Sequence, residues 1–175
     1  MKKLGLLLAS IFVMTLATQQ VKAQTGASAS ASAEAKATVV TVISITKTSD
    51  LNFGSFAPGA NGGKVSVELD GTRSFTDGVT LLDQGEMPTR ALFTVKGTEN
   101  AGFYVELPDA NSVSLTGPAD AEPMKITSFV HNAGVNPALD GNGEKELIVG
   151  GTLAVNPNQP AGEYTGTFDV IVAYP

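Results

Sequence analysis

The stretch ASASASAEAKATVVTVISI, residues 27–45, decides how the chain is interpreted, because apolar and polar residues alternate along almost its whole length. An extended backbone with a period of two has one apolar and one polar face. A strand of this length would reach about 60 Å, whereas strands in small domains usually run about 5–6 residues. One small domain cannot hold the whole stretch, so we expect it to divide near Thr38.

The two halves of the stretch differ in bulk. The Val/Ile-rich half, residues 39–45, is predicted to be the first strand of the folded domain. The Ala/Ser-rich half has two interpretations: a flexible, solvated tail, or a strand that completes the sheet of a neighbouring molecule. In the second interpretation, the apolar face of this candidate donor strand consists of Ala27, Ala29, Ala31, Ala33, Ala35 and Ala37.

The N-terminus has the pattern of a secretory signal peptide. Lys2 and Lys3 precede an apolar run over residues 4–17, and Val21-Lys22-Ala23 has small or aliphatic residues where signal peptidase requires them. The run is too short for a typical membrane span. We therefore expect a signal peptide over residues 1–23, an extension over 24–37, and one domain over 38–175. The expected location is the periplasm, the cell surface or a fimbrium, with no transmembrane span in the mature chain.

Charge and cysteine content exclude several functions. Beyond residue 23 the chain has eight basic residues against seventeen acidic ones, which argues against binding to nucleic acid or to anionic membranes. The absence of cysteine from an exported chain rules out disulfides, thiolate metal sites and cysteine nucleophiles. Packing and any assembly must supply the stability.

Many short runs with β-type alternation follow, separated by clusters of Gly, Pro, Asn and Asp, and no helical period is convincing after residue 24. Strand signals at spacings near ten residues predict an all-β fold, an antiparallel β-sandwich. The expected strands after the first are residues 51–56, 64–69, 73–76, 79–82, 91–96, 103–107, 113–115, 124–130, 146–155 and 163–174.

Catalytic and metal-binding patterns are weak. The single histidine, His131, would have to serve any Ser-His-Asp triad, and no Gly-x-Ser-x-Gly motif is present. Residues 140–144 resemble the start of a calcium loop, but Lys145 and Gly151 stand where that loop needs Gly and Glu. A plain hairpin loop is favoured over an irregular calcium site. We expect no enzyme, no metal and no cofactor.

Four motifs together carry a resemblance to a known family. They are Leu-Asn-Phe-Gly at residues 51–54, Phe-Thr-Val at 93–95 with Gly97, Phe-Tyr-Val-Glu-Leu at 103–107, and PAGEYTGTFDVIVAY at 160–174. With these motifs, the chain resembles the spore coat protein U domain and the archaic chaperone–usher pilins. The resemblance is loose over most of residues 38–175 and tight over the last sixteen.

The resemblance implies an immunoglobulin-like, pilin-like sandwich that lacks its last strand. In that family a periplasmic chaperone lends a strand, and the N-terminal extension of the next subunit later replaces it. The implied partners are further copies of this chain or related pilins, a periplasmic chaperone and an outer-membrane usher. The implied groove and chaperone-recognition strand carries Gly162, Tyr164, Phe168, Val170, Val172 and Tyr174.

Two functions follow as expectations. The first is an exported pilin-like structural subunit that assembles by donor-strand exchange into a fimbria or surface polymer. The second is a solitary periplasmic or cell-surface β-sandwich that acts in adhesion or ligand binding, with the N-terminal extension as a flexible tether.

Overall fold

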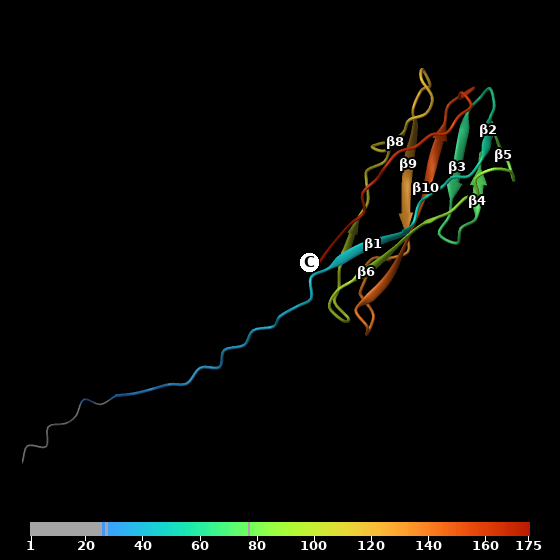
Figure 1. Ribbon diagram of the computed structural model, residues 1–175. Coiled ribbons are helices and arrows are strands. Elements are labelled where there is room, and N and C mark those ends of the chain that lie inside the picture. The colour runs from blue at the N-terminus through green and yellow to red at the C-terminus, as the bar shows by residue number, and fades with distance from the viewer. Residues whose placement is uncertain (1–25, 27, 77) are drawn as a thin grey trace, which may run out of the picture. The chain divides into compact units, whose positions relative to one another are not determined.

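The computed structural model describes residues 26, 28–76 and 78–175 (Figure 1). The predicted signal peptide, residues 1–23, and the candidate donor residue Ala27 lie outside the described residues. Contacts divide the chain into a unit that ends at Ala37 and a compact domain from Thr38 to Pro175. Residues 28–37 are exposed and form no strand.

The domain is built from short antiparallel strands, as expected from alternating runs broken by turn residues. Among the described residues, no helix has the length and hydropathy required to span a membrane. The strands are β1 (Ser44–Ser49), β2 (Phe56–Pro58), β3 (Gly63–Val67), β4 (Arg73–Phe75), β5 (Val79–Leu81), β6 (Ala91–Lys96), β7 (Tyr104–Glu106), β8 (Ser114–Leu115), β9 (Met124–His131), β10 (Glu144–Val155) and β11 (Ile171–Ala173).

The main sheet has the order β1-β6-β10-β3-β4, and β9 pairs with β10 and with β8. The long strand β10 pairs with β6 up to Val149 and with β3 from Gly151 onward. The ladder between β10 and β9 has a register shift between Thr152 and Leu153. Two smaller pairs, β11 with β7 and β2 with β5, complete the fold.

Two buried clusters form the core. One contains Phe53, Val65, Val67, Val79, Val113, Met124, Ile126, Leu153 and Val155. The other contains Ala91, Phe93, Val95, Phe103, Ala133, Leu139, Leu147 and Val149. Leu51, Phe129 and Phe168 contact both clusters, and the rings of Phe129 and Phe168 lie 4.9 Å apart. The prediction of an all-β sandwich is confirmed.

The prediction for the first strand is wrong in its bounds. The ladder between β1 and β6 begins with Ser44 opposite Lys96, so Val39 to Ile43 precede the strand. Val39 is 97% exposed and Val42 is 82% exposed. The reason is that β6 ends at Lys96 and offers residues 39–43 no partner. Alternation in a sequence does not show where the neighbouring strand stops.

The predicted last strand, residues 163–174, is too long. Only Ile171–Ala173 forms a ladder, with β7, and Thr165 forms an isolated bridge with Thr116. Tyr164, Phe168, Val170, Val172 and Tyr174 are half-buried, and they pack on the two core clusters as their shared face requires. Between these points residues 166–170 form no ladder, and along the chain opposite them β7 ends at Glu106 and β8 begins at Ser114.

Candidate functional site

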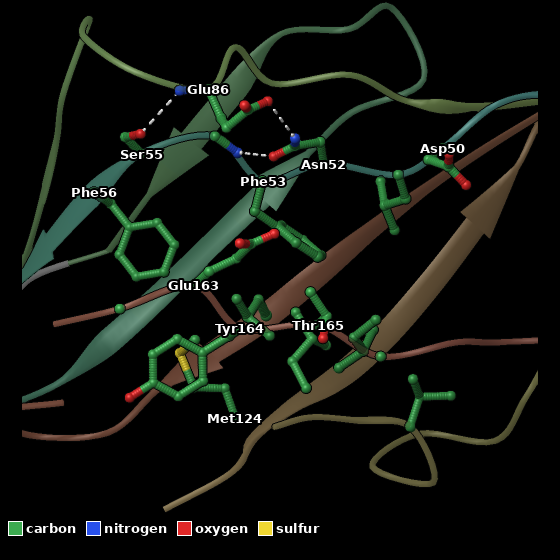
Figure 2. A pocket seen from close by; sticks show the side chains of 18 of the residues that line it. Asp50, Asn52, Phe53, Ser55, Phe56, Glu86, Met124, Glu163, Tyr164 and Thr165 are labelled. Carbon is green, nitrogen blue, oxygen red and sulfur yellow. Dashed lines mark hydrogen bonds between the residues drawn. The ribbon is translucent and has the colours of Figure 1, made fainter. Parts of the chain in front are cut away.

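A groove of about 990 Å³ lies along one side of the domain (Figure 2). Residues 47–58 form its first wall, and residues 159–168 form its second wall. Core side chains form the floor between the walls. These floor residues are Ala91, Phe93, Val113, Leu115, Met124, Ile126 and Leu153. The groove therefore opens directly onto the hydrophobic core.

Hydrogen bonds shape the first wall around Asn52. Its backbone exchanges two bonds with Thr89, of 2.8 and 2.9 Å, and its Oδ1 accepts the N–H of Gly54 at 2.7 Å. Gly54 has a φ of +70°, a conformation that glycine adopts without steric cost. Glu86 adds two contacts: its N–H donates to Ser55 Oγ, and its Oε2 accepts from Asn52 Nδ2 (Figure 2). The Leu-Asn-Phe-Gly motif therefore builds this wall.

The first wall presents an unpaired strand edge to the groove. The backbone bonds of Asn52, and those of Ser55 with Glu86 and Leu82, all run to residues 82–89. In an antiparallel ladder, successive residues direct their N–H and C=O groups to opposite edges. The N–H and C=O of Leu51, which lines the groove, therefore point to the edge opposite residues 82–89.

The second wall is also unpaired over part of its length. Thr165 exchanges two backbone bonds with Thr116, of 2.8 and 2.9 Å, but residues 166–170 form no backbone hydrogen bond to another described strand. Gly162 has a φ of +153°, and the ring of Pro118 occupies the space that a Cβ would take. A glycine is therefore required where this wall begins.

Beyond one end of the groove, β1 and β11 come too close together to admit a strand between them. Cα atoms of β1 and β11 approach within 8 Å, whereas a strand between two others needs about 9.5 Å between its neighbours. Tyr174 bridges this end: its hydroxyl accepts the N–H of Thr98 at 2.6 Å and donates to the carbonyl oxygen of Thr41 at 3.0 Å. The N–H of Thr41 donates in turn to Thr98 Oγ1 at 2.9 Å.

The other end of the groove is lined by Phe56, Met124, Gln159 and Tyr164. Figure 2 shows the rings of Phe56 and Tyr164 with Met124 beside Tyr164. Gln159 is only 5% exposed; its Nε2 donates to the carbonyl oxygen of Glu122 and to the Tyr164 hydroxyl, at 2.9 Å for the hydroxyl. Its Oε1 has no hydrogen-bond partner among the described residues.

The other sequence candidates lie elsewhere. His131 ends β9, and its Nδ1 accepts the N–H of Ala133 at 3.2 Å. Asp140 Oδ1 accepts the N–H groups of Asn142 at 2.8 Å and Glu144 at 2.9 Å, which closes the turn that leads into β10. These hydrogen bonds lower the pKa of Asp140, mainly the bond from Glu144. The described residues contain no cluster of three or more side chains able to hold a metal ion.

Residues far from the expected motifs also shape the groove. Arg73 donates through Nη1 to the carbonyl oxygens of Phe53 and Ser55, at 3.2 and 2.9 Å, and through Nη2 to that of Leu82 at 3.0 Å. Nothing in the local sequence around Arg73, Gln159 or Thr41 indicates these contacts. Each depends on a chain crossing that only the folded structure defines.

Comparison with known proteins assigns the chain to a family. No curated protein and no solved structure matches the chain. A family model covers residues 43–174, which include both walls and the floor of the groove, and the chain accordingly belongs to the family described as Domain of unknown function (DUF4402).

Proposed function

We propose that this chain is an exported structural subunit that assembles by strand exchange, in the manner of pilins. The N-terminal extension of one copy, residues 24–37 and the residues that follow, would enter the groove of another copy. The polymer would then form a fimbria or another surface fibre. The signal-peptide pattern over residues 1–23 supports export.

The observation that carries the proposal is a groove bounded on both sides by unpaired strand edges and floored by the core. Leu51 on one wall, and residues 166–170 on and just beyond the other, offer backbone groups without partners among the described strands. An inserted strand would satisfy both edges and would cover Leu115, Phe168 and their neighbours. Each buried CH₂ group is worth about 0.8 kcal/mol.

The extension has the features of such a strand. Residues 28–37 are exposed, and they alternate between Ala and polar residues. The alanines would face the groove floor, while Ser, Glu34 and Lys36 would face solvent. Because Ala side chains are small, backbone hydrogen bonds would supply most of the affinity, as β-augmentation requires.

The test compares the chain from Gln24 with a chain that lacks residues 24–37, by size-exclusion chromatography with light scattering over a range of concentrations. We expect the full chain to form multimers and the shortened chain to remain a folded monomer. A shortened chain that assembles like the full one would refute the proposal. A full chain that is monomeric at every concentration would favour the second candidate, a solitary binding module.

A matched pair of variants tests the alternation itself. Ala31→Asp with Ala33→Asp places two carboxylates on the face that would meet the apolar floor. Ser30→Asp with Ser32→Asp adds the same charge on the opposite face. We expect the alanine variant to lose assembly and the serine variant to keep it. Equal behaviour of the two variants would contradict insertion as a strand.

A further inference from the structure

We infer that Val39 of one copy anchors the inserted strand at the end of the groove lined by Phe56, Met124, Gln159 and Tyr164 of a second copy. This inference rests on the proposed function. It specifies which residues of the inserted strand lie at which end of the groove, and therefore the direction in which the strand runs. Val39 continues the odd-numbered apolar face of the extension and is its only bulky member before Thr41. It is also 97% exposed, so no contact within the domain explains it.

Val39 cannot reach the Phe56 end of the groove in its own copy. Thr41 is held at the narrow end by Thr98 and Tyr174. Two residues of extended chain reach roughly 7 Å from Thr41. The far end of the groove lies beside Phe56, and nine residues of wall separate it from Lys47 at the narrow end, roughly 30 Å of extended chain. The occupant must therefore come from a second copy.

The narrow end also sets the direction of the inserted strand. The approach of β1 and β11 within 8 Å leaves no room for a strand to continue past this end. The end of the inserted strand that stops at the narrow end must be its N-terminal end, because its C-terminal end continues into the folded domain of its own copy. The C-terminal side of the inserted strand, which carries Val39, then lies at the opposite end.

The length of the extension agrees with this register. The first wall covers residues 47–58, and an inserted strand over residues 29–39 would span roughly the same distance, about 33 Å. Ala29 would then lie near the narrow end and Val39 near Phe56 and Tyr164. The far end also holds Gln159 Oε1, a buried acceptor without a hydrogen-bond partner among the described residues.

The Gln159 amide orientation is fixed by its surroundings. The atom that faces the carbonyl oxygen of Glu122 must be the nitrogen, since a carbonyl oxygen only accepts. Tyr164 donates its hydroxyl hydrogen to the carbonyl oxygen of Pro160 at 2.8 Å, so it accepts from the same nitrogen. The side-chain atom of Gln159 without a hydrogen-bond partner among the described residues is therefore the oxygen, which is an acceptor.

A pair of substitutions tests the anchor. Val39 and Val42 are both exposed but lie on opposite faces of an extended chain. We expect Val39→Asp to raise the protein concentration needed for assembly by about tenfold or more, and Val42→Asp to leave it nearly unchanged. Because both side chains are exposed in the free domain, neither substitution should unfold it.

Engineered cysteines test the direction, and the natural chain contributes none that could interfere. Ala161 and Lys47 are both exposed and line opposite ends of the groove. Val39→Cys with Ala161→Cys should form disulfide-linked dimers and longer chains on mild oxidation. Val39→Cys with Lys47→Cys should not.

The outcomes separate the two proposals. Assembly of the chain that lacks residues 24–37 would refute the proposed function itself. Loss of assembly in that chain, with equal effects of Val39→Asp and Val42→Asp, would refute only the anchor. Crosslinking to position 47 instead of 161 would reverse the direction. A disulfide within one monomer would overturn the assignment to a second copy.

Discussion

The hydroxyl of Tyr174 donates a 3.0 Å hydrogen bond to the carbonyl oxygen of Thr41, which joins the last strand to the segment that precedes the first. The same hydroxyl accepts the N–H of Thr98, the residue that also binds the N–H of Thr41. Figure 1 shows the C-terminus close to the start of β1, in agreement with this bond. One side chain therefore holds the base of the extension and the narrow end of the groove.

Tyr174→Phe should lower the free energy of unfolding by about 1–2 kcal/mol, because it removes one acceptor and one donor while it keeps the ring. Urea unfolding measures the change. Tyr104→Phe is the control: Tyr104 is 50% exposed, and its hydroxyl has no hydrogen-bond partner among the described residues. Equal stability of the two variants would show that the Tyr174 hydroxyl contributes nothing.

Gly97→Ala should destabilise the domain by about 1–3 kcal/mol through overpacking. A Cβ at this position would overlap the Tyr174 hydroxyl and would lie 2.9 Å from Leu139 Cδ1. Gly141→Ala is the matched control, since a Cβ there meets nothing within 4 Å, and we expect a change within about 0.5 kcal/mol. Thermal unfolding followed by circular dichroism compares the two. A Gly97→Ala variant as stable as the control would contradict the close approach of Tyr174.

Asp140 should titrate below the value of about 3.9 found for aspartate in model peptides. The N–H of Glu144, followed by that of Asn142, favours its carboxylate form and lowers its pKa. Because the pKa is lower in the folded state, the contribution to stability is present above about pH 4 and is lost as the pH falls through the lowered pKa. NMR titration of the carboxyl carbon measures this midpoint.

Asp140→Asn provides the control for this titration. The asparagine keeps an acceptor oxygen but does not titrate. The contribution of this side chain to the pH dependence of stability should therefore be absent from the variant. A midpoint for Asp140 at or above 3.9 would contradict the two hydrogen bonds.

Local alternation predicted much of the fold because strand phase is a local property. Residues 91–96 were expected as a strand and coincide with β6, where Ala91, Phe93 and Val95 are buried. In the last predicted strand, Phe168 and Val172 lie on the same face of the alternation, and both pack on the core. A period of two identifies these faces without any knowledge of the neighbouring strands.

Strand pairing could not be predicted in the same way, because it depends on residues far away in the sequence. Residues 39–43 have the composition of a strand but no partner, since β6 ends at Lys96. Residues 166–170 alternate equally well and also lack one. Residues 166–168 line the groove, so part of its second wall is a segment without a strand partner, and only the resemblance to a family suggested such a groove.

The guanidinium of Arg73 connects the first wall of the groove to the end of β5, and its loss should loosen that wall. It donates to the carbonyl oxygens of Phe53, Ser55 and Leu82. Arg73→Lys keeps the charge, but an ammonium lacks the planar fork that reaches three carbonyls. We expect a loss of about 1.5–3 kcal/mol in the free energy of unfolding and faster amide exchange in residues 53–55.

Arg90→Lys is the control for Arg73, since Arg90 donates a single bond, of 2.9 Å, to the carbonyl oxygen of Leu69. Loss of this bond should lower the free energy of unfolding by less than Arg73→Lys does, and it should leave the amide exchange of residues 53–55 unchanged. If the groove accepts a strand along this wall, Arg73→Lys should also weaken assembly while Arg90→Lys does not. Equal exchange rates in the two variants would show that Arg73 does not hold the wall in place, and the groove would then owe its shape to Asn52 and Gly54 instead.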